Sequence, residues 1–152
     1  MNRWMKIAYD EAVKGMLNNE GGPFGAVIIK DGEIIASRHN EVLKTNDPTA
    51  HAEINVIREA SKKLQTFDLS ECTLYTSCQP CPMCLGAIFW ARIKTVYYGA
   101  TKEDAQKGGF DDKHFYSMIK GENNIVNLEQ IDHEESAKLF DIWNEKSDAK
   151  TY

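Results

Sequence analysis

Apolar residues recur every third or fourth position at the start of the chain. One stripe of such residues consists of Trp4, Ala8, Ala12 and Met16. This spacing predicts an amphipathic helix over roughly residues 2–18. The next apolar segment, GAVIIKDGEIIASR, has two β-branched runs separated by Asp31 and Gly32, and this pair of residues favours a two-residue hairpin turn.

The middle of the chain alternates between helical and strand patterns. Residues 39–48 are polar and indicate a loop, and a helical stripe begins at Thr49, which Asp47 or Thr49 itself can cap. The segment CTLYTS then favours a strand, CPMCLGAIFWA a mostly apolar and buried helix, and TVYYGA a second buried strand. Strands that alternate with helices are typical of crossover units in a sheet covered on both faces.

Toward the C-terminus the pattern weakens into a charged, irregular segment. Residues 123–129 (NNIVNLE) then predict a short strand, and residues 132–146 predict an amphipathic helix. Asp132 and Glu135 have the spacing of a capping box at the start of that helix. The length suits one core, so we expect a single domain over residues 1–152.

The chain carries a formal net charge of -5 at pH 7, which argues against a protein whose main task is to bind a nucleic-acid backbone. Its basic clusters are short and are explained as solvated ends of helices and strands. They are Arg58 with Lys62 and Lys63, and Arg92 with Lys94.

No apolar run approaches the ~20 residues of a membrane span, and the first residues lack the apolar block of a signal peptide. We therefore expect a cytoplasmic protein with neither nucleic acid nor membrane as a partner, whose reduced cysteines are metal ligands rather than disulfides.

Two predicted helix starts carry the residues best suited to chemistry. His51 and Glu53 begin one helix, and Cys81 and Cys84 begin the other. Cysteines three residues apart face the same side of a first helical turn, and a helix N-terminus favours the thiolate that binds metal. Two thiolates and one imidazole suit one Zn²⁺ per chain and leave a fourth position for water. Zinc would lower the pKa of that water toward ~7, and Glu53 would carry its proton to a leaving group.

Two other interpretations of the cysteines stay open. Cys78 could be a fourth ligand and make the site a structural zinc clip, although Glu53 would then have no role. A ferredoxin-type iron–sulfur site would need a further cysteine at position 88, where this chain has isoleucine. Cys72 and Cys78 are better explained as strand-end residues. The remaining histidines are expected to be solvated at the surface, and they are His39, His114 and His133.

The combination of His51-x-Glu53 with Pro80-Cys81-x-x-Cys84 resembles the signature of the cytidine-deaminase-like zinc deaminases over residues 1 to about 100. The resemblance implies hydrolytic deamination with zinc as the cofactor and Glu53 as the catalytic residue. It also implies an α/β fold, a three-layer α/β/α sandwich around a central mixed sheet of about five strands.

Further segments resemble the bacterial guanine deaminases of this superfamily over nearly the whole chain. They are GGPFGAVIIKDGEIIA, TNDPTAHAE, LYTSCQPCPMCLGAIFWAR and GFDD. The closer resemblance implies five substrate-binding residues: Phe24 against the purine, Asn40 at the base edge, Ala52 between His51 and Glu53, Asp112 near the reacting amine, and Tyr152 closing the pocket. It also implies a homodimer that exchanges C-terminal segments.

The predicted reaction is therefore the conversion of guanine, as a free base, to xanthine and ammonia. Guanine presents donors at N1 and N2, which suits a carboxylate, an acceptor-only partner. Ordinary structural roles stay open for these residues: Phe24 in the core, Asn40 in a turn, and Asp111 with Asp112 as a solvated pair. Alternative functions are a tRNA adenosine deaminase, which would need a basic groove, a cytosine or cytidine deaminase, and a structural zinc-binding module.

Overall fold

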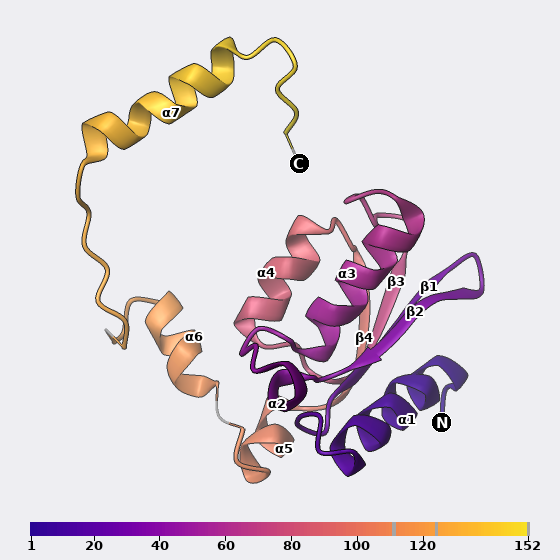
Figure 1. Ribbon diagram of the computed structural model, residues 1–152. Helices are drawn as coiled ribbons and strands as arrows, with labels where there is room; N and C mark the ends of the chain where they lie inside the picture. Colours follow the sequence, from indigo (N-terminus) through magenta and orange to yellow (C-terminus); the bar gives the residue numbers. More distant parts are fainter. Residues whose placement is uncertain (111, 124, 152) are drawn as a thin grey trace. The chain divides into compact units, whose positions relative to one another are not determined.

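Figure 1 shows the computed structural model, which describes residues 1–110, 112–123 and 125–151. The chain divides into two compact units, Met1–Lys113 and His114–Tyr152. Among the described residues, no helix combines the length and the apolar character needed to cross a membrane. The expectation of a single domain over residues 1–152 stays a prediction.

The first unit is built on a four-stranded sheet in the order β2-β1-β3-β4 (Figure 1). β1 pairs antiparallel with both β2 and β3, whereas β3 pairs parallel with β4. The sheet is therefore mixed, as expected. The strands are β1 (Gly25–Lys30), β2 (Glu33–His39), β3 (Thr73–Cys78) and β4 (Thr95–Ala100). The predicted hairpin turn is present between β1 and β2, where Asp31 and Gly32 have the positive φ values, 51° and 76°, that a two-residue turn requires.

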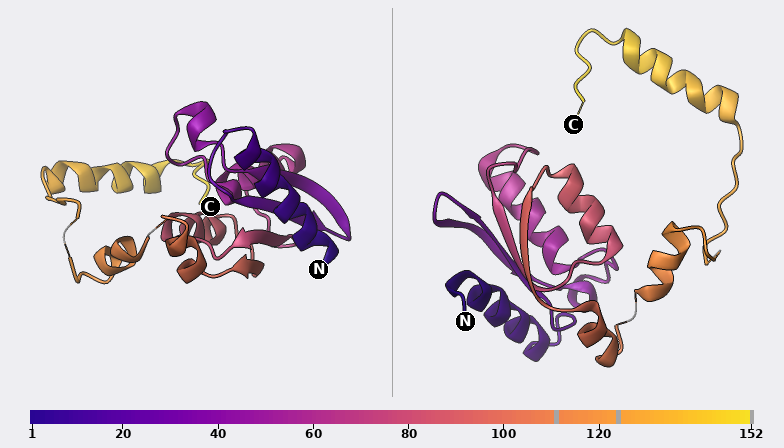
Figure 2. Two further views of the ribbon diagram at one scale, coloured as in Figure 1. Left: turned by 90° about the horizontal axis from the view of Figure 1, so that it is seen from below. Right: turned by 180° about the vertical axis from the view of Figure 1, so that it is seen from behind.

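Helices cover both faces of this sheet (Figure 2). α1 (Arg3–Leu17) lies on one face, where Ala8 belongs to a cluster with Val27 and Ile29. α3 (Ala52–Leu64) and α4 (Pro82–Trp90) lie on the other face and share the larger core cluster with β1 and β3. That cluster includes Ala26, Ile28, Val56, Leu74 and Ile88. The three-layer α/β/α sandwich is therefore confirmed.

Two segments expected to be buried are buried only in part. β4 lies at the edge of the sheet, and its Tyr97 and Tyr98 are about half exposed. α4 buries Ile88 but exposes Leu85 and Phe89. The apolar composition of both segments predicted their secondary structure correctly. It did not predict their burial, because burial depends on which neighbours cover each face.

The polar segment before α3 was also more structured than expected. It contains a short helix, α2 (Val42–Thr45). The residue that caps α3 is His51, and its side chain makes no capping hydrogen bond. Asp47 instead accepts a hydrogen bond from the backbone N–H of Thr49 at 2.8 Å, which forms a turn ahead of the helix. The expected capping of α3 by Asp47 or Thr49 was therefore wrong.

Among the described residues, three helices follow the sheet. The sequence did not predict α5 (Lys102–Lys107), although Thr101 and Asp104 form a capping box at its start. The other two helices are α6 (Lys113–Ile119) and α7 (His133–Glu145). The helix expected near residues 132–146 is confirmed as α7. Its predicted capping box is absent from the described residues: Asp132 has a φ of 49° and its side chain makes no capping bond, whereas a capping side chain is usually on extended backbone.

The described part of residues 123–129 contains no strand. Among the described residues the sheet has four strands, one fewer than the approximately five expected. The apolar residues that suggested the fifth strand, Ile125, Val126 and Leu128, are more than half exposed. Exchange of the C-terminal segment between two chains stays a prediction.

Candidate active site

The starts of α3 and α4 bring the two halves of the sequence motif together. His51 directly precedes α3 and Cys81 directly precedes α4, each on extended backbone. Pro82 occupies the first turn of α4, where the N–H that proline lacks would have no helical partner. The parallel crossover from β3 through α4 to β4 thus presents Cys81 and Cys84 to the start of α3.

The donor atoms of His51, Cys81 and Cys84 have the spacing of a zinc site. Nδ1 of His51 lies 3.6 Å from Sγ of Cys81 and 3.6 Å from Sγ of Cys84. Tetrahedral zinc, with bonds of about 2.0 Å to nitrogen and about 2.3 Å to sulfur, places such atoms about 3.6 Å apart. The three atoms lie within 4.8 Å of one another. Three protein ligands of this type are typical of catalytic zinc, so these residues fit the expected metal.

The electrostatics of this group favour a cation. Hydrogen bonds from the Cys84 thiol and then from His51 lower the pKa of Cys81 to about 4. The hydrogen bond to Cys81 raises the pKa of His51 above its usual range. The proton shared with Cys81, together with burial, raises the pKa of Cys84. The surroundings thus favour the thiolate form of Cys81, and metal binding releases the protons that the ligands still hold.

Glu53, in the first turn of α3, places a carboxyl group beside the metal group. The residue is only 6% exposed. Its Oε1 accepts a hydrogen bond from Oγ1 of Thr76 at 2.9 Å, and its Oε2 lies 3.5 Å from Sγ of Cys84. Burial raises the pKa of Glu53 above its ordinary value. A carboxyl group that can both hold and release a proton suits general acid–base chemistry.

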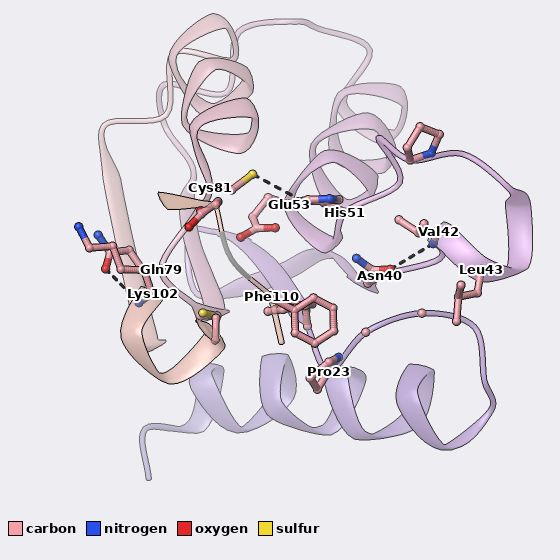
Figure 3. A pocket seen from close by; sticks show the side chains of 17 residues that line it. Pro23, Asn40, Val42, Leu43, His51, Glu53, Gln79, Cys81, Lys102 and Phe110 are labelled. Carbon is pink, nitrogen blue, oxygen red and sulfur yellow. Dashed lines mark hydrogen bonds between the residues drawn. The ribbon is translucent and has the colours of Figure 1, made fainter. Parts of the chain in front are cut away.

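A cavity of about 620 Å³ opens beside these residues (Figure 3). Its volume is in the usual range for small-molecule sites, about 300–1,000 Å³. His51, Glu53 and Cys81 line one part of it, and residues of loops, of α2 and α5 and of the end of β3 line the rest. These loop residues include Phe24, Asn40, Phe110 and Asp112. The first unit therefore brings three of the predicted substrate-binding residues, Phe24, Asn40 and Asp112, to one cavity with the catalytic candidates.

Asn40 has a fixed orientation at this cavity (Figure 3). Its Oδ1 accepts a hydrogen bond from the backbone N–H of Val42 at 3.1 Å, and its own backbone N–H donates to the carbonyl of Phe24 at 2.9 Å. Gly21 permits this packing, because a Cβ at position 21 would lie 2.1 Å from Oδ1. One lone pair of Oδ1 is thus occupied by Val42, and Nδ2 is the donor that Asn40 can offer to a ligand.

The aromatic wall of the cavity has a member that the sequence reasoning missed. Phe110 packs edge to face against Phe24, with ring centroids 4.9 Å apart and an interplanar angle of 85°. Both rings lie over Gly22, where a Cβ would approach them to 2.8 and 3.0 Å. The signal was in the segment GFDD, which drew attention only for its aspartates. Thr76, the partner of Glu53, was also missed, because its role depends on a contact between segments distant in the chain.

The other predicted site residues are distributed differently. Cys84 is fully buried behind the cavity, and Ala52 belongs to the main core cluster. Cys78 lines the cavity, but the potential metal group near it among the described residues consists only of His51, Cys81 and Cys84. Asp111 and Tyr152 lie outside the described residues.

His39 is not the solvated surface residue that was expected, whereas His114 and His133 are exposed. Nδ1 and Nε2 of His39 lie 2.7 Å from Glu11 and 2.6 Å from Glu20. With Glu20 and Glu41 it forms a second group of potential metal ligands, but Lys44 already lies 3.2 Å from each of these two carboxylates. Hydrogen bonds of His39 and ion pairs of Lys44 therefore form a network that connects α1 and the loop before β1 to the residues on either side of Asn40.

The fold, the paired helix starts and the His/Cys/Cys group beside a buried glutamate define a deaminase of the zinc-binding type. The model of the cytidine and deoxycytidylate deaminase zinc-binding region matches residues 1–100, and the chain belongs to this family. It is 47% identical over 151 residues to the guanine deaminase of Bacillus subtilis (strain 168), which covers 98% of this chain and 97% of that protein.

Two further similarities concern structure and an alternative substrate. The X-ray structure of guanine deaminase from Bacillus subtilis has a TM-score of 0.95 at 47% identity and covers 100% of this chain and 99% of that one. A tRNA-specific adenosine deaminase of Buchnera aphidicola subsp. Schizaphis graminum is 40% identical over 137 residues, which covers 90% of this chain and 89% of that protein. The family is therefore shared by enzymes whose named substrates differ in size and charge.

Proposed function

We propose that this protein catalyses the hydrolytic deamination of guanine to xanthine and ammonia. The observation that carries the proposal is the 47% identity to Bacillus subtilis guanine deaminase over 98% of the chain. This similarity extends beyond the zinc-binding region that ends at residue 100 and includes the segment with Asp112. In the reaction, water adds an oxygen to C2 of guanine, the bond from C2 to the exocyclic nitrogen breaks, and ammonia leaves.

The proposed catalytic group consists of Glu53 and three zinc ligands, His51, Cys81 and Cys84. When bound, zinc supplies Lewis acidity that makes water a nucleophile near neutral pH. Glu53 accepts a proton from the attacking water and delivers it to the departing nitrogen. Its burial and its contact with Cys84 support this role, because they hold a carboxyl group with little exposure to solvent beside the metal group.

The loop residues are proposed to recognise the purine. The ring of Phe24 packs against the base, and Nδ2 of Asn40 donates to an acceptor on its edge. Asp112 accepts hydrogen bonds from the donors at N1 and N2 of guanine. Ala52, whose side chain is in the core, would contact the base through its backbone. The closing role of Tyr152 rests on the family resemblance alone.

A tRNA adenosine deaminase is the second candidate, and the 40% identity to the Buchnera enzyme supports it. An anticodon arm carries many phosphates, and proteins that bind such polymers gain affinity from basic surfaces. The net charge of -5 and the short basic clusters of this chain favour a neutral small-molecule substrate instead.

The test is ammonia release from a panel of substrates by the zinc-loaded protein. The panel contains guanine, guanosine, cytosine, adenine and tRNA, with xanthine measured by chromatography and inosine by nucleoside analysis of the tRNA. We expect xanthine from guanine and no inosine in tRNA. Inosine in tRNA without xanthine from guanine would support the second candidate and contradict the first.

We propose that the working form is a homodimer with exchanged C-terminal segments. The C-terminal unit supports this, because its helix α7 exposes a set of large apolar side chains that the described residues of the unit do not bury. They are Leu139, Phe140, Ile142 and Trp143. Exposed apolar surface of this kind usually marks an interaction site. Light scattering after size-exclusion chromatography measures the mass of the protein in solution and therefore tests whether two chains associate.

A further inference from the structure

We propose that Thr76 is a positioning residue that fixes the carboxyl group of Glu53 for proton transfer. The inference rests on the proposed function, since that function gives Glu53 its role. Thr76 does not line the cavity. It acts on the reaction through Glu53 and is not itself a catalytic residue.

The position of Thr76 in β3 makes its hydroxyl group unusual. Leu74, Thr76 and Cys78 alternate with partly exposed residues and form the buried face of this strand, and Leu74 belongs to the main core cluster. Thr76 is only 1% exposed. A hydroxyl group buried among apolar residues destabilises the fold unless it is hydrogen-bonded, and valine would fill the same volume without that cost. The partner that satisfies the hydroxyl is Oε1 of Glu53, at 2.9 Å.

The strand that carries Thr76 is one of the most constrained in the molecule. β3 is hydrogen-bonded on both sides, with Thr76 opposite Ala26 of β1 and Tyr98 of β4. Glu53, in contrast, lies in the first turn of α3. The hydrogen bond therefore connects the carboxyl group at a helix start to the fixed backbone of the central sheet, which is the kind of support that a catalytic side chain needs.

The contact also distinguishes the two oxygens of the carboxyl group. The terminal torsion of a glutamate is soft and has no sharply preferred angle, so the group can rotate unless a partner holds it. Thr76 engages Oε1, and Oε2 is left on the side of Cys84, 3.5 Å from its sulfur. Oε2 is therefore the oxygen that receives and returns the proton, and loss of the Thr76 hydroxyl group would let the carboxyl group turn away from the metal group.

The direct test replaces Thr76 with valine, which keeps the shape and removes the hydroxyl group. We expect kcat on guanine to fall about 10–100-fold, the usual effect of removing a residue that orients a reacting group, while KM changes less than about twofold. Thr76→Ser restores the hydroxyl group and should recover most of kcat. Thr73→Val is the matched control, because it makes the same substitution on the other face of the same strand, and it should leave kcat unchanged.

Two further measurements separate positioning from a general structural effect. Zinc content and the affinity for xanthine, measured by calorimetry without turnover, should be the same in Thr76→Val and the parent. In the Glu53→Gln background, Thr76→Val should cause no further loss, because the group that it positions is already inactive. Should Thr76→Val fail to retain zinc, Thr76→Ala provides a second variant without the hydroxyl group for comparison with Thr76→Ser.

The outcomes for Thr76 and for the proposed function can be told apart. A parent protein that binds zinc but converts no guanine contradicts the proposed function. An active parent whose Thr76→Val variant retains kcat within about twofold overturns the inference about Thr76 alone. A loss in Thr76→Val that Thr76→Ser does not recover, or that persists undiminished in the Glu53→Gln background, overturns it as well.

Discussion

Glu53 combines deep burial with an ionisable side chain, and the side chains of Thr76 and Cys84 contact its two oxygens. Glu53→Gln keeps the size of the side chain and an oxygen for Thr76, but the amide cannot carry a proton. We expect zinc content and melting temperature close to those of the parent, and a fall in kcat of about 10²–10⁴-fold. Near-normal turnover by a zinc-loaded Glu53→Gln protein would show that another group carries the proton.

Cys78 and Cys81 are close in sequence but differ in their environments. Burial raises the pKa of Cys78 to about 11, and its sulfur lies 3.6 Å from the carbonyl oxygen of Thr101, whereas Cys81 has a pKa of about 4. Cys81→Ala should therefore lose zinc, and also stability, because the ligands connect α3 with α4. Cys78→Ala should keep about one zinc per chain. Metal analysis that finds Cys78→Ala free of zinc would instead support a structural clip.

Asp112 tests the recognition of guanine separately from its chemistry. Asp112→Asn places an amide donor where the base also presents donors, so a polar group is left unmatched in the cavity, at a cost of about 1–3 kcal/mol. We expect a raised KM for guanine with unchanged zinc content. Asp111→Asn is the matched control and should have the smaller effect. Equal kinetic effects of the two substitutions would mean that the pair is a solvated turn.

At the residue scale, the sequence predicted those site residues whose positions depend on spacing along the chain. His51, Cys81 and Cys84 could be found because their positions relative to two helix starts bring their donor atoms together. Phe110, and the contacts of His39 with Glu11 and Glu20, could not be found, because they depend on contacts between segments distant in the chain.

At the scale of elements, the loop before β1 and the segment with Phe110 meet around Gly22. A methyl group at this position would approach Phe24 and Phe110 to 2.8 and 3.0 Å, so Gly22→Ala should displace the aromatic wall and raise the KM for guanine several-fold, with little change in zinc content. Gly86→Ala in α4 is the control, because a Cβ there meets nothing within 4 Å in the described structure and alanine favours a helix by about 1 kcal/mol. An unchanged KM in Gly22→Ala would remove the aromatic pair from the site.

The elements themselves show where sequence patterns succeed. The hairpin and α1, α3 and α7 were predictable because turn residues and helical periodicity are local signals. The strand expected at residues 123–129 was wrong because a short apolar run becomes a strand only where another strand can pair with it. The exposed face of α4 was missed for a related reason, since apolar composition does not say which chain, if any, covers a helix.

At the scale of the whole molecule, apolar residues are exposed in both units. α4 exposes Phe89 and Trp90, and α7 exposes Phe140 and Ile142. A chain with a net charge of -5 gains solubility from its charge, but these apolar surfaces still favour association. The proposed dimer gives such surfaces a partner, and it predicts that single substitutions of α7 residues by lysine lower the measured mass in solution toward that of one chain.

The last prediction concerns the end of the chain, NEKSDAKTY. Terminal residues usually fray, and the family resemblance alone gives Tyr152 a role in closing the site, where exclusion of water would strengthen the polar contacts. Deletion of residues 148–152 should therefore leave zinc content and melting temperature nearly unchanged and lower turnover of guanine.

If segments are exchanged, mixing tail-deleted chains with Glu53→Gln chains should restore activity, because one site per mixed dimer then has both an intact Glu53 and an intact tail. Full activity after the deletion would contradict the role of the tail. Loss without restoration, in mixed dimers shown to form, would mean that the tail serves the site of its own chain.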